Sequence, residues 1–341
     1  MQLAPFRKGT RQRRQKVGVI AYAAASDLQP LELPRVGMLS RLIIQFRGTV
    51  TLSGAGALSD LGPWNLLNRI RVTANIGTAS LVDVTGYGLY LMQPYLDSIG
   101  FRPDAGGAGA TTPNADIHVA PVAMGANTWV LTWIVPISAN AGREFDIGLV
   151  NLQAPETRIT LELRTGALLD PATLVTATTG NFHIYYEFYE IPDPTRFQMP
   201  PLGLVRTLEE QQPIGQTGDN VYTVPRQGTM LQLIHLVRLN ALRSDGFDTT
   251  ELRFNKNDRV YAQERQWLRL QDRAFHGVQP VTGAYAWDMW RAYGHVAEGD
   301  LRDAIDTEEL STFESAVNIT GGLGANNNFF HAIRRIVQSF E

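Results

Sequence analysis

Apolar side chains recur at every second residue in many short runs, and this alternation restricts the chain to β-rich folds. Leu42, Ile44 and Phe46 fall on one side of the first run, whereas Arg41 and Gln45 fall on the other. Runs of the same kind occupy residues 69–73, 81–84, 129–135, 159–164 and 182–188. Turn-rich segments at 53–56, 75–78 and 104–114 separate them. Many short strands with turns between them predict a sandwich or a barrel.

One helix and one break interrupt this pattern. Leu89, Met92 and Leu96 recur at helical spacing, so we predict a helix near 88–98, shortened or kinked because Pro94 lies within it. Further on, the segment 191–201 reads IPDPTRFQMPP. Its four prolines are incompatible with a central strand or a helix interior, which predicts a linker between two domains.

The second half of the chain repeats the order of elements in the first half. Strand patterns near 229–242, 251–254 and 259–262 precede a helical pattern near 264–275, and further strands follow at 285–290, 313–319 and 329–337. The motif ELRF at 251–254 mirrors RIRV at 69–72. We therefore predict a basic N-terminal arm and lead-in (1–35), a first β domain (36–191), a proline-rich linker (192–201) and a second β domain (202–341).

Positive charge is concentrated at the N-terminus. Residues 1–16 carry six cations and no acid, namely Arg7, Lys8, Arg11, Arg13, Arg14 and Lys16. Since the whole chain has a net charge of -3, residues 17–341 carry -9. A basic arm of this kind, usually disordered when free, predicts contact with a polyanion, either nucleic acid or an anionic membrane surface. An acidic protein face, or a solvated tail with no partner, is the alternative.

The motifs of several enzyme classes are missing from the sequence. Cysteine is absent, which excludes disulfides, thiolate nucleophiles and iron–sulfur clusters. The sequence has no P-loop, no GxSxG and no SxxK. Its six histidines are scattered singly, without the HxH pair of cupin-type metal sites. We therefore expect no catalytic residue, cofactor or metal.

Two residue groups leave alternatives open. Trp129, Trp133, Trp287 and Trp290 are expected to lie in the core or at a subunit interface. The alternative is that these four and Trp267 are exposed and form a carbohydrate-binding platform. The acidic segment 298–309 lacks the alternating oxygen ligands of a calcium loop, which favours a solvated face. Whether this segment binds a cation stays open.

The order of elements resembles a known viral family. A long strand, SRLIIQFRGTVTL, precedes LLNRIRVTANIGTASLVDVTGYGLYLM, and the counterparts in the second half are TMLQLIHLVRLN and TELRFNKNDRVYAQERQWLRL. Together with the basic arm and the proline-rich linker, this set resembles the double jelly-roll major capsid proteins of tailless icosahedral viruses. These form the tectivirus, corticovirus and adenovirus-hexon lineage, and the resemblance covers residues 36–340.

The resemblance implies an all-β fold of two consecutive eight-stranded jelly rolls with short helices inserted. It implies a structural major capsid protein whose homotrimers form pseudo-hexagonal capsomers that tile an icosahedral virion shell, as in a bacteriophage. The basic arm would lie beneath the shell, against an internal membrane or the genome, and minor capsid or vertex proteins would be partners. Because the region after the arm lacks the apolar core of a signal peptide, we expect assembly in the host cytoplasm.

Two other functions remain open at this stage. One is a two-domain carbohydrate-binding or adhesion protein, such as a fibre or spike component. The other is a jelly-roll glycosidase or lyase that uses paired carboxylates, for which Glu187, Glu190 or Glu162 are the candidates. The resemblance favours the capsid protein, which is not an enzyme.

Overall fold

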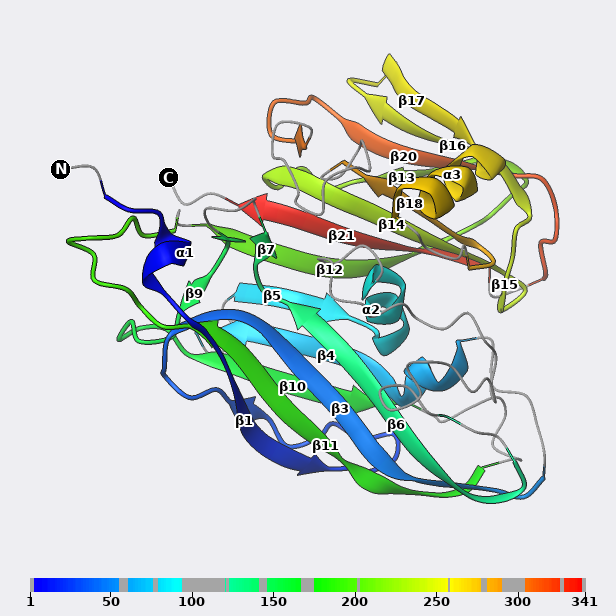
Figure 1. Ribbon diagram of the computed structural model, residues 1–341. Helices are drawn as coiled ribbons and strands as arrows, with labels where there is room; N and C mark the ends of the chain where they lie inside the picture. The colour runs from blue at the N-terminus through cyan, green and yellow to red at the C-terminus, as the bar shows by residue number, and fades with distance from the viewer. Residues whose placement is uncertain are drawn as a thin grey trace. The chain divides into compact units, whose positions relative to one another are not determined.

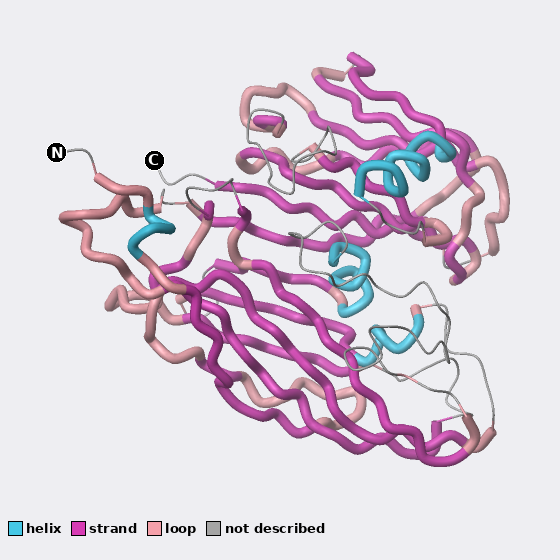
Figure 2. Tube along the Cα trace, viewed as in Figure 1, coloured by secondary structure: helices cyan, strands magenta, loops and turns pink. Residues whose placement is uncertain are grey.

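The computed structural model describes residues 3–54, 61–75, 79–93, 120, 123–140, 146–166, 175–200, 203–256, 258–276, 281–289, 304–325 and 328–338. Antiparallel strands dominate these residues, and the helices are short (Figure 2). None of the helices in these ranges is both long and apolar enough to cross a membrane. The backbone divides into two compact units, unit 1 (Met1–Thr207) and unit 2 (Leu208–Ser339).

Unit 1 is built from eight principal strands in two antiparallel sheets (Figure 1). The first sheet has the order β1 (Gln12–Ala21), β11 (Val175–Tyr189), β3 (Met38–Leu52) and β6 (Gly125–Pro136). The second has the order β5 (Ala79–Val84), β4 (Leu67–Ala74), β10 (Ile159–Thr165) and β2 (Leu31–Glu32). The minor strands are β7 (Ala139–Asn140), β8 (Asp146–Ile147) and β9 (Val150–Asn151). The helices are α1 (Phe6–Gly9), the 3-10 helix η1 (Gly62–Leu66) and α2 (Gly86–Met92).

Unit 2 contains the same arrangement. One set of paired strands has the order β12 (Leu204–Pro213), β21 (Phe329–Gln338), β14 (Thr229–Leu239) and β18 (Ala284–Asp288). The other sheet has the order β13 (Gly218–Thr223), β20 (Phe313–Ile319), β16 (Phe247–Phe254) and β17 (Asp258–Glu264). The short strands β15 (Leu242–Arg243) and β19 (Ile305–Asp306) pair with β14. Helix α3 (Arg265–Gln271) continues into a π-helical turn, Asp272–His276.

The strand order identifies both units as jelly rolls. When the eight principal strands of unit 1 are numbered along the chain, one sheet reads 1-8-3-6 and the other 2-7-4-5. Unit 2 gives the same two orders. Two sheets in which the first strand lies beside the last, and the second beside the seventh, define an eight-stranded jelly roll. The predicted fold class, a double jelly roll with short inserted helices, is confirmed.

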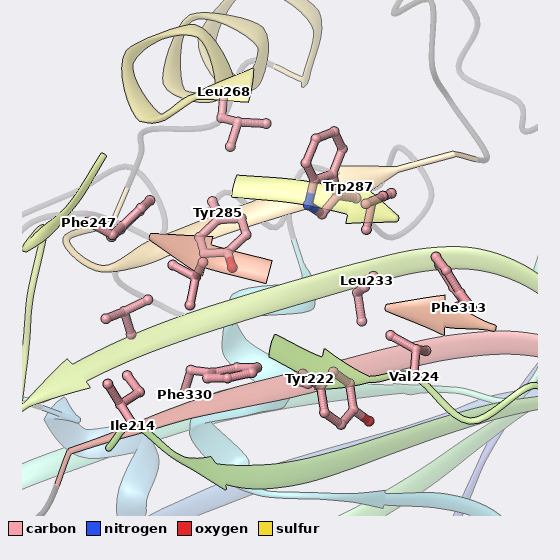
Figure 3. Close-up of a cluster of buried hydrophobic side chains, with 14 of the residues drawn as sticks. Ile214, Tyr222, Val224, Leu233, Phe247, Leu268, Tyr285, Trp287, Phe313 and Phe330 are labelled. Carbon is pink, nitrogen blue, oxygen red and sulfur yellow. The ribbon is translucent and has the colours of Figure 1, made fainter. Parts of the chain in front are cut away.

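The apolar residues that alternate along the strands form the cores of the two units. In unit 1, Phe46 of β3 and Phe182 of β11 are fully buried, and their ring centroids lie 5.3 Å apart. In unit 2, Leu233, Phe247 and Phe313 come from three different strands and are buried in one cluster (Figure 3). Each fully buried side chain of this size contributes about 1.5–3 kcal/mol of hydrophobic free energy.

The helices follow the same strand in each unit. Helix α2 comes after β5 and α3 after β17. All seven residues of α2 are buried, whereas α3 buries Leu268. The Thr85 hydroxyl caps α2 by accepting a hydrogen bond from the Gly88 amide at 2.9 Å. Helix α2 therefore begins two residues before the predicted start. The part of that prediction from residue 94 on lies outside the described residues.

The boundary between the units differs in position from the predicted linker. Residues 192–200 belong to unit 1, where the Gln198 amide donates to the Ala4 carbonyl at 2.8 Å. Strand β12 then begins in unit 1, and the Arg206 side chain donates to the Ser80 carbonyl at 2.9 Å. The proline-rich segment is thus fixed by backbone hydrogen bonds to the N-terminal segment, and the division falls after Thr207.

A buried histidine lies in the core of unit 2. His235 of β14 is fully buried, stacks on Tyr285 with 4.8 Å between centroids, and meets Phe330 edge-on. Neither ring nitrogen has a hydrogen-bond partner in the described part of the chain. Burial away from water lowers the pKa of His235 to about 3, because no group there compensates a charged ring.

We predict that His235→Phe removes part of the acid sensitivity of unit 2. In the unfolded chain the ring takes up a proton near its ordinary pKa of 6.5, whereas the folded protein resists protonation down to about 3. Stability is therefore lost as the pH falls from 6.5 towards 3, by about 1.4 kcal/mol per pH unit. Between pH 7 and pH 5, urea unfolding should show that the variant loses about 2 kcal/mol less than the parent. Equal losses in both proteins would contradict this account.

Candidate assembly surfaces and the basic N-terminal segment

The start of the chain is fastened to unit 1. Phe6 of α1 is 1% exposed, packs against Met38 and Leu149, and meets the Tyr189 ring edge-on with 5.7 Å between centroids. Gly9 lies so close to Phe197 that a Cβ there would come within 2.4 Å of the ring. These contacts hold residues 3–10 on the domain, where the sequence predicted a loose arm.

Strand β1 continues this attachment as the edge strand of its sheet. It pairs antiparallel with β11 from Gln12 opposite Tyr189 to Ala21 opposite Asn181. A register shift between Lys16 and Gly18 leaves Val17 without a partner in the ladder. Four of the six predicted cations, from Arg11 to Lys16, therefore lie on or beside a strand.

A buried carboxylate anchors β1. The Glu187 side chain is 4% exposed, and its Oε1 accepts a hydrogen bond from Arg14 Nε at 2.6 Å. Its Oε2 accepts from Gln12 at 3.2 Å and also pairs with Arg41 of β3. One carboxylate thus connects three neighbouring strands, and its charge is matched by two guanidinium groups.

The other cations of the segment differ in their surroundings. Arg13 forms an exposed ion pair with Glu190 at 2.8 Å, with side chains 53% and 46% exposed. Arg7 is half-buried. Lys8, Arg11 and Lys16 are exposed, and their side chains make no hydrogen bond or ion pair with the residues that the structure describes. These three are the cations best placed to meet an external anion.

We predict that Glu187→Gln loosens β1 far more than Glu190→Gln does. The first change leaves Arg14 and Arg41 facing a buried neutral amide, at a cost of about 1–3 kcal/mol. The second removes an exposed pair worth about 0–1 kcal/mol, so it serves as the matched control. Amide hydrogen exchange along residues 12–21 measures the difference. Similar protection in the two variants would show that Glu187 does not anchor the strand.

The predicted tryptophans take different positions. Trp129 and Trp133 of β6 are fully buried in unit 1, and the Trp133 indole donates to the Gly86 carbonyl at 3.1 Å. Trp287 of β18 is buried in unit 2. Trp290 lies outside the described residues. Of the tryptophans in the described ranges, Trp267 alone is exposed, at 50%.

The candidate carboxylates are engaged with arginines. Glu187 and Glu190 pair as described above, and Glu162 lies 3.5 Å from Arg71. No group of three or more His, Cys, Asp or Glu side chains that could hold a metal occurs in the described part of the chain. In the acidic segment, residues 298–303 lie outside that part. Asp306 accepts a hydrogen bond from the Glu308 amide at 3.0 Å.

Comparisons with known proteins identify the fold. No family model matches the sequence, and no curated protein matches it either. The structure is similar to the major capsid protein of Sulfolobus turreted icosahedral virus, with a TM-score of 0.70 and 14% identity, over 96% of this chain and 97% of that one. The capsid protein of the PBCV-1 virus gives 0.66 and 8%, over 96% and 93%. The major capsid protein of bacteriophage PM2 gives 0.55 and 12%, over 97% and 98%.

These similarities establish a class by fold. The chain has the double jelly-roll fold of those viral major capsid proteins, which confirms the structural side of the resemblance drawn from the sequence. The similarity extends over nearly the whole of this chain and of the two major capsid proteins.

Proposed function

We propose that this chain is the structural major capsid protein of an icosahedral virus, located in the virion shell. The observation that carries the proposal is the pair of jelly rolls with identical strand order, matched along nearly the whole chain by viral major capsid proteins. Three chains with two similar domains each would present six similar corners, so the assembly unit is a homotrimer that forms a pseudo-hexagonal capsomer. Closed symmetry of this kind is the usual form of homo-oligomers.

The alternative functions have less support. A carbohydrate-binding platform needs several exposed aromatic rings, whereas Trp267 alone is exposed among the tryptophans in the described ranges. A glycosidase needs two carboxylates facing a cleft, whereas Glu187 and Glu190 pair with arginines. The solved structures that resemble this chain are capsid proteins rather than enzymes. A bacterial host accords with the similarity to bacteriophage PM2, and minor capsid or vertex proteins would complete such a shell.

The oligomeric state tests the proposal. We expect light scattering on the purified chain at moderate salt to give a molar mass near three chains, or a much larger mass if shells form. The reason is that exposed edge strands and side chains of each jelly roll are covered only in the assembly. A monodisperse monomer at every concentration would overturn the proposal.

The basic N-terminal segment is proposed to contact the packaged genome or an internal membrane. The exposed cations Lys8 and Arg11 have no partner among the described residues, and a phosphate group offers the complementary charge. Arg13 and Arg14 contribute less to such contact, because Glu190 and Glu187 neutralise them within the chain.

We predict that Lys8→Gln with Arg11→Gln weakens binding to double-stranded DNA, or to vesicles containing anionic lipid, by about tenfold at 0.1 M salt. Removing two phosphate contacts should also lower the slope of log K against log salt by about two for DNA. Arg158→Gln with Lys256→Gln, both exposed and outside residues 1–21, is the control with the same charge change. Equal binding by both double variants would remove the segment from this role.

A further inference from the structure

One outward sheet face of unit 1 is strongly basic. The antiparallel register places Arg14, Arg41 and Glu187 in one row across β1, β3 and β11, and Lys16 follows one row further on. Arg47 of β3 lies on the same side, opposite Asn181. Four cations and one carboxylate give this surface, here called the basic face, a net charge of +3.

The side chain of His183 does not change the net charge of the basic face. His183 lies on the basic face opposite Gln45, and its pKa is lowered by burial and by the charges of Lys16 and Arg47. The ring is therefore neutral at pH 7. Of the three exposed cations on the face, Arg14 pairs with Glu187, whereas Lys16 and Arg47 have no carboxylate partner among the described residues.

In unit 2, the outward face of the sheet formed by β13, β20, β16 and β17 is acidic. Glu251, Glu264 and Glu314 lie on the outer side of β16, β17 and β20, and Asp219 lies on β13 beside them. The one described cation among them is Arg253, which pairs with Asp219 at 2.8 Å and with Glu251 at 2.7 Å. This surface, here called the acidic face, carries -3 from its described side chains.

Each face also carries an exposed apolar side chain. Val19, on the same side of β1 as Lys16, is 48% exposed, and Val221 of β13 is 47% exposed beside Ala316. On both faces the charged side chains listed for the test below are solvent-accessible: Lys16, Arg47 and Glu264 are exposed, and Glu314 is half-buried. Neither face is therefore fully covered by the part of the chain that the structure describes.

We propose that the basic face of one copy docks on the acidic face of a second copy. This inference rests on the proposed function, because it names the surfaces through which copies associate. Opposite net charges favour that pairing and disfavour contact between like faces of two copies. The two surfaces differ, so the contact is head-to-tail, and such contacts give a closed ring when the rotation between copies allows it. The exposed valines would supply apolar contact beside the charges.

Charge reversal tests the pairing. The first variant is Lys16→Glu with Arg47→Glu, and the second is Glu264→Lys with Glu314→Lys. Each brings like charges together in the contact, so each should raise the dissociation constant by about tenfold or more. The variant with all four changes restores opposite charges within one chain type. Its dissociation constant should lie within about threefold of that of the parent, because the two faces still carry opposite charges.

Measurements by sedimentation at 0.05 M and 0.5 M salt complete the test. The parent and the four-change variant should both dissociate more readily at high salt, since screening weakens opposite charges at an interface. Arg158→Glu with Arg196→Glu, both exposed and on neither face, is the control and should associate like the parent. Urea unfolding of every variant establishes that it is folded.

The outcomes separate this inference from the proposed function. If the parent is an oligomer and both double variants keep its dissociation constant, the docking of these faces is wrong while the capsid function stands. The inference is also wrong if Lys16→Glu with Arg47→Glu abolishes DNA binding without changing association. In that case the basic face would be a nucleic-acid surface. A parent that stays monomeric would instead contradict the proposed function itself.

Discussion

Each jelly roll depends on a late strand inserting between two earlier ones. In unit 1, β11 lies between β1 and β3, and in unit 2, β21 lies between β12 and β14. Fourteen residue pairs join β11 to β3, so most of the first sheet rests on contacts between residues far apart in sequence. The buried rings of Phe46 and Phe182 meet across this pairing. The edge strand β1 and its carboxylate anchor, Glu187, have a place only after β11 has joined the sheet.

The sequence predicted much of this framework and missed particular parts of it. Strands such as β3 and β11 were predictable because one side of each is buried and the other is partly wet, so the apolar pattern follows the pleat. The repeat of elements was visible for the same reason, and α3 was predicted within a few residues. Strands β1 and β12 were missed because charged and polar residues fill them, as in QRRQK and RTLEEQQ, and their outer parts are exposed.

The role of Glu187 was beyond the sequence for a different reason. Its partners, Arg14 and Arg41, lie 173 and 146 residues away, and only the strand register brings the three together. In the sequence, Glu187 and Glu190 share one strand, so both were candidates for a catalytic carboxylate. The structure shows a side chain closed off by two guanidinium groups. By contrast, the surroundings of Trp129 and Trp133 are local, because Leu131 and Val135 share their face within the same strand and are buried with them.

The position of β21 also determines how much of the chain must be synthesised before unit 2 can fold. Because β21 (Phe329–Gln338) is an interior strand, no growing chain shorter than about 330 residues has the finished first sheet of unit 2. Before β21 is synthesised, the edges of β12 and β14 that pair with it are unpaired. Unpaired strand edges tend to pair with strands of other chains. Truncated or still-growing chains therefore lack the surface geometry of the finished domain. A chain whose synthesis stops before β21 cannot form the complete sheet of unit 2, because the missing strand is an interior one.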